Sequence, residues 1–225
     1  MLEGIKRWLA GNAAPTQRPG ARTTLEAFGS WSRAPQLQIR AAREGEGVIV
    51  DGKTDDMPWR LEWGASQRPY VPGQELRIRA ELPLGNELQA IVLNRVLQEA
   101  IEKTMFEQFV EGVQTRLDTE TPAEMRWVVM HPKLSRLELG DLADRYAAAG
   151  SIKPWLVQWL SGPLGTSLQA LPIDPATAFV LMVNRGKVTL RTEVEEPSPR
   201  SFEPHLRSFE TALREARRVK LDGGT

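Results

Sequence analysis

Arginine recurs on one side of several segments in which polar and apolar residues alternate. Arg40, Arg60, Arg77 and Arg79 each stand next to apolar residues in such segments. Successive side chains of a β-strand point to opposite faces, so we expect these arginines on the polar face of a sheet, together with Glu62, Glu75 and Glu81. This mixture favours either cross-strand ion pairs or a docking face for an acidic partner, because guanidinium groups bind carboxylates well. Both interpretations stay open while the strand order is unknown.

The longest connection between these predicted strands carries a second set of candidates. It reads GASQRPYVPG, with Arg68 directly before the first proline and Tyr70 between the two prolines. Loops on a rigid scaffold carry function more often than cores do. We therefore expect Arg68 and Tyr70 to contact a partner. The alternative is a small-molecule or enzymatic site under the loop 66–73, built from carboxylates, arginine and His131.

Tryptophan is unusually frequent, with seven residues against two tyrosines. Trp155 and Trp159 are four positions apart, which places them on one face of a predicted helix. Aromatic side chains anchor interfaces, and they also fill cores. This pair is a candidate partner-binding surface, although its place on the apolar side of the helix favours the core. Trp59 and Trp63 on a strand are likewise expected in the core.

Residue counts and spacing exclude several kinds of catalytic and metal site. The chain has no cysteine and two histidines, which excludes a thiol nucleophile, a cysteine-ligated metal and a three-histidine site within one chain. Asp51, Asp55 and Asp56 offer oxygen ligands, but the pattern of a calcium-binding EF-hand fails. Nucleotide-binding and hydrolase motifs are missing from the sequence. We expect no catalytic residue, no metal and no cofactor, and the sequence leans against an enzyme without deciding the question.

Charge and hydropathy narrow the class of protein further. The 225 residues include 29 basic and 29 acidic side chains. Proteins that bind nucleic acid usually carry a basic surplus, so no nucleic acid is expected as a partner. No apolar run reaches the length of about 18 residues that a transmembrane helix needs. The N-terminal sequence lacks the apolar stretch of a secretory signal, so the expected location is the cytoplasm.

Residues 1–22 differ from the rest in composition. Residues 2–10 can form a short amphipathic helix with Leu2, Ile5 and Leu9 on one face, followed by a flexible linker rich in Gly and Pro. Four basic residues against Glu3 give the segment a charge of +3. We expect a mobile arm, with an anchor for an anionic membrane surface through residues 2–10 as the alternative.

The remaining residues, 23–225, predict a single α+β domain. Its elements in chain order are a helix over 23–34, four strands within 37–82, a long helix over 86–115, a strand over 125–130, helices over 135–149 and 151–160 within an insertion at about 134–172, strands over 179–183 and 188–194, and a last helix. The order α-ββββ-α-β-ααα-ββ-α predicts a largely antiparallel sheet of about seven strands with helices packed on one face.

This element order is similar to that of type III secretion chaperones and the related YbjN-like proteins. The resemblance implies a non-enzymatic, often dimeric protein that binds another protein. An extra early strand and the helical insertion depart from it, so no residue roles are carried over. We therefore expect a non-catalytic interaction, adaptor or chaperone-like module of the bacterial cytoplasm, which binds another protein and can form a homodimer.

Overall fold

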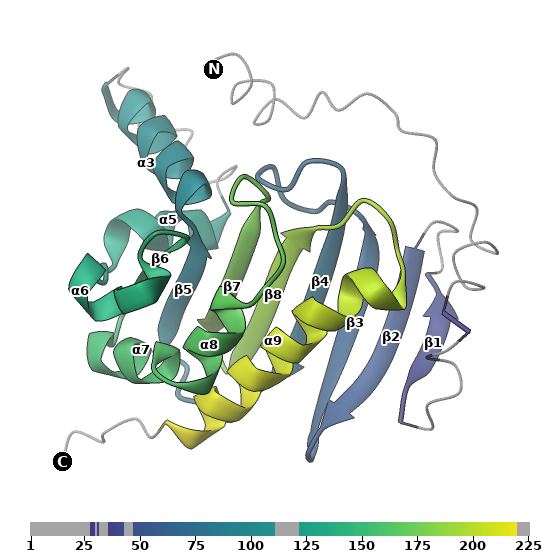
Figure 1. Ribbon diagram of the computed structural model, residues 1–225. Coiled ribbons are helices and arrows are strands. Elements are labelled where there is room, and N and C mark those ends of the chain that lie inside the picture. The colour runs from purple at the N-terminus through teal and green to yellow at the C-terminus, as the bar shows by residue number, and fades with distance from the viewer. Residues whose placement is uncertain (1–27, 30, 32–35, 43–46, 111–121, 220–225) are drawn as a thin grey trace.

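Eight strands form one antiparallel sheet in the computed structural model, which describes residues 28–29, 31, 36–42, 47–110 and 122–219 (Figure 1). The sheet order is β1-β2-β3-β4-β8-β7-β5-β6. The strands are β1 (Gln38–Ala41), β2 (Gly47–Thr54), β3 (Met57–Ala65), β4 (Gln74–Glu81), β5 (Gln89–Asn94), β6 (Tyr146–Gly150), β7 (Phe179–Asn184) and β8 (Lys187–Glu193). The predicted α+β class with a largely antiparallel sheet is confirmed, with eight strands in place of about seven. Residues 1–22, and most of the helix expected over 23–34, lie outside the described residues.

In the described part of the chain, four helices cover one face of the sheet. They are α6 (Arg136–Leu139), α7 (Lys153–Leu160), α8 (Pro163–Gln169) and α9 (Pro199–Arg218), and the short 3-10 helix η2 (Gly140–Leu142) follows α6. α9 crosses the strands diagonally (Figure 1). Ser198 begins α9 by accepting a hydrogen bond from the backbone N–H of Ser201, in a reciprocal capping box.

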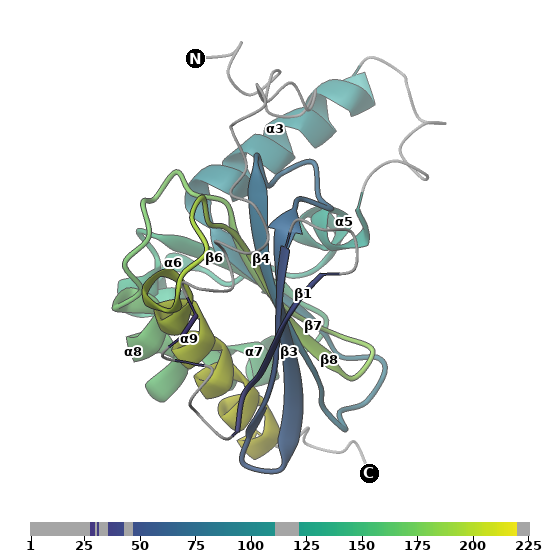
Figure 2. The ribbon, with the colours of Figure 1, turned by 90° about the vertical axis from the view of Figure 1, so that its right-hand side faces the viewer.

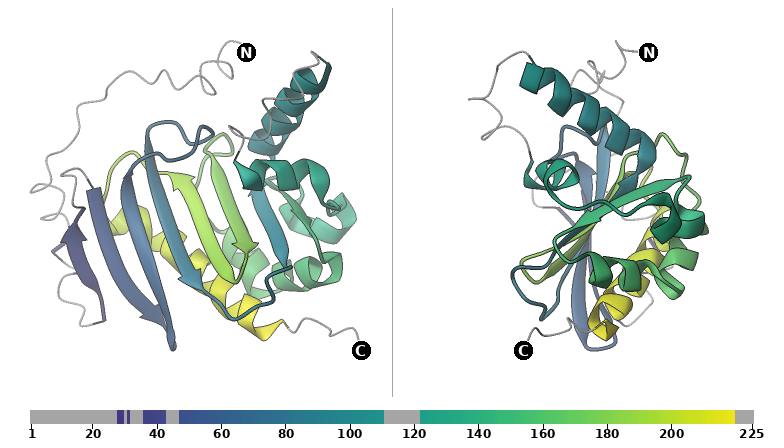
Figure 3. Two further views of the ribbon diagram at one scale, coloured as in Figure 1. Left: turned by 180° about the vertical axis from the view of Figure 1, so that it is seen from behind. Right: turned by 90° about the vertical axis from the view of Figure 1, so that its left-hand side faces the viewer.

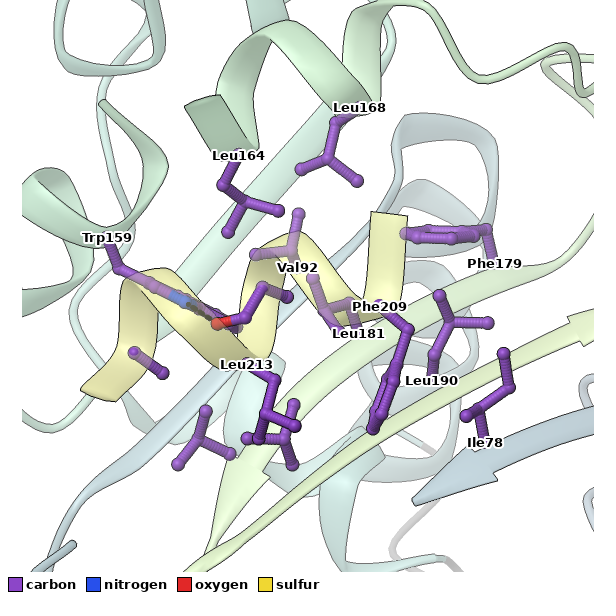
Figure 4. Close-up of a cluster of buried hydrophobic side chains, with 14 of the residues drawn as sticks. Ile78, Val92, Trp159, Leu164, Leu168, Phe179, Leu181, Leu190, Phe209 and Leu213 are labelled. Atoms are coloured by element: carbon purple, nitrogen blue, oxygen red, sulfur yellow. Dashed lines mark hydrogen bonds between the residues drawn. The ribbon is translucent and has the colours of Figure 1, made fainter. Parts of the chain in front are cut away.

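The main core lies between this layer and the sheet (Figure 4). Alternation supplies its strand residues, such as Ile78 on β4 and Leu190 on β8, which lie opposite each other in register. Phe209 and Leu213 of α9 pack onto them, and both are fully buried. The alternate residues of β1 to β4 and β8 therefore point to the opposite side of the sheet.

Two further helices, α3 (Arg95–Val110) and α5 (Ala123–Met130), lie on that opposite side (Figures 2 and 3). They cover β5, β6 and β7 through a second buried cluster that includes Ile91, Leu97 and Val128. The prediction placed helices on one face, so this second layer is a correction. It reaches only half of the sheet, and the described helices leave β1 to β4 uncovered on that side (Figure 3).

Residues 89–94 form β5, where the pattern predicted the first turns of a helix beginning at residue 86. The segment QAIVLN is apolar without alternation, because helices bury both of its faces. Over so few residues such a run has the same appearance as one turn of a buried helix. The helix itself, α3, begins only at Arg95.

In two other segments the structure has a helix where a strand was predicted, or a strand where a helix was predicted. Residues 123–130 are the helix α5, where a strand was predicted over 125–130. Residues 146–150 are the strand β6, where the end of a helix over 135–149 was predicted. β-branched Val128 and Val129 favour strands, and the alanines of β6 favour helices. Packing overrides both preferences, since α5 buries one face on the sheet and β6 completes the sheet by pairing with β5.

No helix within the described ranges is both long and apolar enough to cross a bilayer.

Candidate functional site

The uncovered side of β1 to β4, together with β8, carries a band of arginines and carboxylates. We call this band the arginine face; it consists of Arg40, Asp51, Arg60, Glu62, Glu75, Arg77, Arg79 and Arg191. Its residues alternate with those that pack under α9, so the band lies on the sheet face away from that helix, the face turned to the viewer in the left view of Figure 3. The guanidinium-bearing side chains of Arg40, Arg60 and Arg79 are 45%, 41% and 49% exposed, so the band is open to solvent.

Asp51 of β2 lies between Arg40 of β1 and Arg60 of β3. Arg60 Nε donates to Asp51 Oδ1 at 2.7 Å, and Arg40 Nη2 donates to Asp51 Oδ2 at 3.2 Å. Burial alone would raise the pKa of Asp51, but the hydrogen bond and charge of Arg60, and then those of Arg40, outweigh it and hold the pKa below its ordinary value. Asp51 therefore stays ionised and fixes two guanidinium groups.

Glu62 of β3 accepts hydrogen bonds from two further arginines, Arg77 and Arg79. Arg77 Nη2 donates to Glu62 Oε2, and Arg79 Nη2 donates to Glu62 Oε1 at 3.0 Å. Burial opposes ionisation here too, but the hydrogen bond and charge of Arg77, followed by the charge of Arg79, keep the pKa of Glu62 below its ordinary value. Arg77 also donates to the side-chain oxygen of Gln67, which joins the loop to the face.

The innermost ion pair joins Arg191 of β8 to Glu75 of β4. The two side chains are 8% and 2% exposed, respectively. The backbone N–H of Gln67 donates to the other oxygen of Glu75 at 2.8 Å. Breaking a buried pair leaves an uncompensated charge, so this pair fixes the structure at the point where the open half of the sheet meets the covered half.

The loop 66–73 is packed down rather than open. Tyr70 is fully buried, and its hydroxyl donates to Glu124 Oε1 of α5 at 2.9 Å. Arg68 Nε donates to the same oxygen. Burial, and then the negative charge of Glu124, raise the pKa of Tyr70 well above its ordinary value. Tyr70 and Val71 are both buried beneath the loop, in the cluster that α5 completes.

His131 does not reach that loop. It follows the last turn of α5, and its Nε2 lies 2.8 Å from Gln89 Oε1. Glu124 stands in the first turn of the same helix, which spans about 12 Å. The structure therefore keeps His131 apart from Arg68 and Tyr70.

Two pairs of arginines face each other across the strands, and Glu75 likewise lies opposite Glu193. Arg60 lies directly opposite Arg79, and Arg77 lies directly opposite Arg191. Such pairs are unfavourable unless carboxylates compensate them. The face as defined has five arginines and three carboxylates. Lys53, Glu81, Lys187 and Glu193 lie on the same side of their strands and add two charges of each sign, so the surplus stays at two positive charges. The exposed guanidinium groups of Arg40, Arg60 and Arg79 have more N–H donors than these bonds use, which leaves donors for carboxylates from another molecule.

The two tryptophans named as partner-binding candidates lie elsewhere. Trp155 and Trp159 are 3% and 0% exposed, and their rings pack against each other. The indole N–H of Trp159 donates to the Ala212 carbonyl at 2.9 Å, and that of Trp155 to the Val219 carbonyl at 3.3 Å. Both belong to the contact between α7 and α9 in the core.

The aspartates considered for calcium are held by arginines. Asp55 and Asp56 form the turn between β2 and β3 and pair with Arg214 and Arg217 of α9. Across the described ranges, the structure has no group of three or more histidine, aspartate or glutamate side chains that could hold a metal.

The sequence patterns missed Arg191, Gln67 and Glu124 as members of this network. Alternation in β8 could have assigned Arg191 to the polar face. Its proximity to Glu75 depends on β4 and β8 being neighbours, which no local pattern shows. Gln67 and Glu124 act through a loop and a helix end, where spacing carries no signal.

Comparison with known proteins gives a fold but no family. No protein-family model matches the chain, and no curated protein matches it. A crystal structure of the mycobacterial trehalose monomycolate transport factor A, TtfA, is similar over 90% of this chain and 99% of that one, with a TM-score of 0.51 and 10% sequence identity. At this identity the likeness concerns the fold alone.

Proposed function

We propose that this protein is a non-catalytic protein-binding module whose arginine face binds an acidic segment of a partner protein. The exposure of Arg40, Arg60 and Arg79 on an uncovered sheet face carries the proposal. Arginine is well suited to this role, because its planar guanidinium binds carboxylates with two parallel hydrogen bonds.

Asp51 and Glu62 support the same role. They hold four arginines in place without using all of their N–H donors. Side chains that are ordered before binding lose less conformational entropy when a partner arrives. The surplus of positive charge would also speed the encounter with an acidic segment.

A transport-associated role is the broader form of this proposal. The likeness in fold to a protein described as a transport factor supports it, although no residue role is taken from that protein. The activity we expect is to hold another protein rather than to convert a substrate.

Binding of a fluorescein-labelled poly-glutamate peptide, followed by fluorescence anisotropy, tests the proposal. Reversing two charges of the face with Arg60→Glu and Arg79→Glu should weaken binding by about tenfold or more. The matched control carries Arg207→Glu and Arg218→Glu on the exposed side of α9, which changes net charge equally. The control should bind as the wild-type does, and binding should weaken as salt is raised.

Equal losses in both double variants would show attraction by net charge only and would overturn the proposal. Absence of binding by the wild-type chain at low salt would overturn it as well. Mass spectrometry of proteins that co-purify with wild-type chain, but not with the Arg60/Arg79 variant, would then identify the natural partner.

A further inference from the structure

One side of α3 carries four exposed residues in a symmetrical order. Val96, Glu99, Lys103 and Phe106 are separated by three, four and three positions, which keeps them on one face of the helix. Val96 is 50% exposed and Phe106 is 68% exposed, and the two charged residues between them are also exposed. We call these four residues the α3 stripe.

The opposite side of α3 already has its packing partners. Leu97 and Ile101 are each 2% exposed and belong to the cluster that α5 and β5 complete. Beyond that contact α3 projects past the edge of the sheet (Figures 1 and 2). The α3 stripe is thus a second apolar surface on a helix whose first apolar surface is satisfied.

The two charges of the stripe lack partners within the described part of the chain. Other charged side chains near α3 are paired, as Glu102 is with Lys133. Neither Glu99 nor Lys103 forms an ion pair with a described residue, and they do not pair with each other although they are one turn apart. Among the described residues, the stripe therefore presents an acid and a base without ion-pair partners, flanked by two apolar groups.

Read from either end, the stripe has the same spacing, and its charges exchange sign. A second copy that packs antiparallel, with its two-fold axis near residue 101, brings Glu99 of one copy to Lys103 of the other. The same operation brings Val96 to Phe106, and both contacts occur twice. We propose that this protein forms a homodimer through antiparallel packing of the α3 stripes of two copies. A two-fold interface of this kind must be self-complementary, and the stripe has that property.

The charge pattern indicates that the partner of the α3 stripe is a second copy of the chain. Apolar residues on a partner would satisfy Val96 and Phe106, but a surface that supplies a base and an acid in the reverse order and at the same spacing is this surface itself. Packed helices lie 8–10 Å apart, which places residues of facing stripes in contact. A single helix pair buries less area than a standard interface, so the dimer should dissociate on dilution.

Sedimentation of the full chain tests the proposal through charge exchange. The wild-type chain should form a dimer at high concentration. Glu99→Lys alone places two lysines together, and Lys103→Glu alone places two glutamates together, so each should raise the dimer dissociation constant about tenfold or more. An equimolar mixture of the two variants should dimerise again, because each copy then supplies what the other lacks. The variant with both changes in one chain should dimerise as the wild-type does.

Controls separate this interface from other effects. Glu203→Lys with Arg207→Glu reverses an exposed pair of the same spacing on α9 and should leave the dimer unchanged. Phe106→Ser should weaken the dimer without lowering thermal stability, since the side chain is mostly exposed. A monomeric wild-type chain, dimers in both single variants, or failure of the mixture to dimerise while both variants melt as the wild-type does would each overturn the proposal.

Discussion

The hydroxyl of Tyr70 donates a hydrogen bond to Glu124 and thereby ties the loop 66–73 to the first turn of α5. Burial works against the charge on Glu124, but the hydrogen bond and charge of Arg68, together with the Tyr70 hydroxyl, hold its pKa below the ordinary value. The contact thus joins the arginine face to the second helical layer, because Gln67 of the same loop holds Arg77 and Glu75.

Removing this hydroxyl should be more costly than removing that of the chain's other tyrosine. Tyr70→Phe leaves a buried carboxylate with one donor fewer and should lower the free energy of unfolding by about 2 kcal/mol. Tyr146→Phe removes a bond to the neutral Leu168 carbonyl and should cost about 1 kcal/mol. Urea denaturation measures both, and an equal or reversed order would contradict the importance of the charged acceptor.

His205 should make the protein sensitive to mild acid. Burial lowers the pKa of this histidine to about 4, and its Nδ1 is buried without a hydrogen-bond partner in the described part of the chain. The unfolded chain, with a pKa near 6.5, binds more protons between these values, so unfolding becomes easier as pH falls from 6.5 to 4. The loss at pH 4 should approach about 3 kcal/mol.

Replacing this histidine should flatten that part of the stability curve. His205→Leu removes the titrating group and keeps an apolar side chain at a buried position. His131→Gln, at the far less buried histidine, should leave most of the slope in place. Urea midpoints measured across this pH range decide the matter, and an unchanged slope in the His205 variant would refute the assignment.

Trp159 should behave as a core residue. Trp159→Ala removes a fully buried ring and its hydrogen bond to Ala212, so it should cost about 3–5 kcal/mol of unfolding free energy. Leu137→Ala, at a side chain that is 91% exposed, should change stability by less than about 0.5 kcal/mol. A Trp159 variant that kept its stability but lost a binding partner would reverse this conclusion.

Gly52 should resist substitution because the Trp59 ring lies across it. A Cβ at position 52 would overlap with ring atoms of Trp59, its cross-strand partner. Gly52→Ala should therefore cost about 1–3 kcal/mol. Combining it with Trp59→Leu should cost less than the two changes added together, since the smaller side chain removes the clash. Strict additivity in thermal denaturation would contradict this account.

The arginine face could be foreseen in part from the sequence. Alternation placed Arg40, Arg60, Arg77 and Arg79 on one polar side, because a half-covered antiparallel sheet imposes period two. It could not show that Asp51 bridges two of them, since that contact requires β1, β2 and β3 to lie side by side in register. It also could not show that Arg191 belongs to the arginine face, since Arg191 contacts Glu75, a residue more than a hundred positions away in the sequence.

The fold was hardest to predict where helices cover both faces of the sheet. β5, β6 and β7 are buried on both sides and so lose the alternation that marks β2, β3 and β4. β6 consists mostly of alanine, a strong helix former, and its small side chains suit a strand between two helical layers. Tertiary packing determines the secondary structure of these segments, and local sequence patterns give no information about it.

The sheet order has a consequence for how the chain acquires its structure. β8 and β7 lie between β4 and β5, although they follow both in the sequence. During synthesis, the backbone groups at the β4 edge of β1 to β4 therefore stay unpaired until residues near 190, which form β8, leave the ribosome. Exposed edges of this kind invite pairing with other chains. Pairing between strands distant in sequence is also slow. The last third of the chain thus joins the two halves of the sheet, and nascent chains released before it is made would be prone to aggregate.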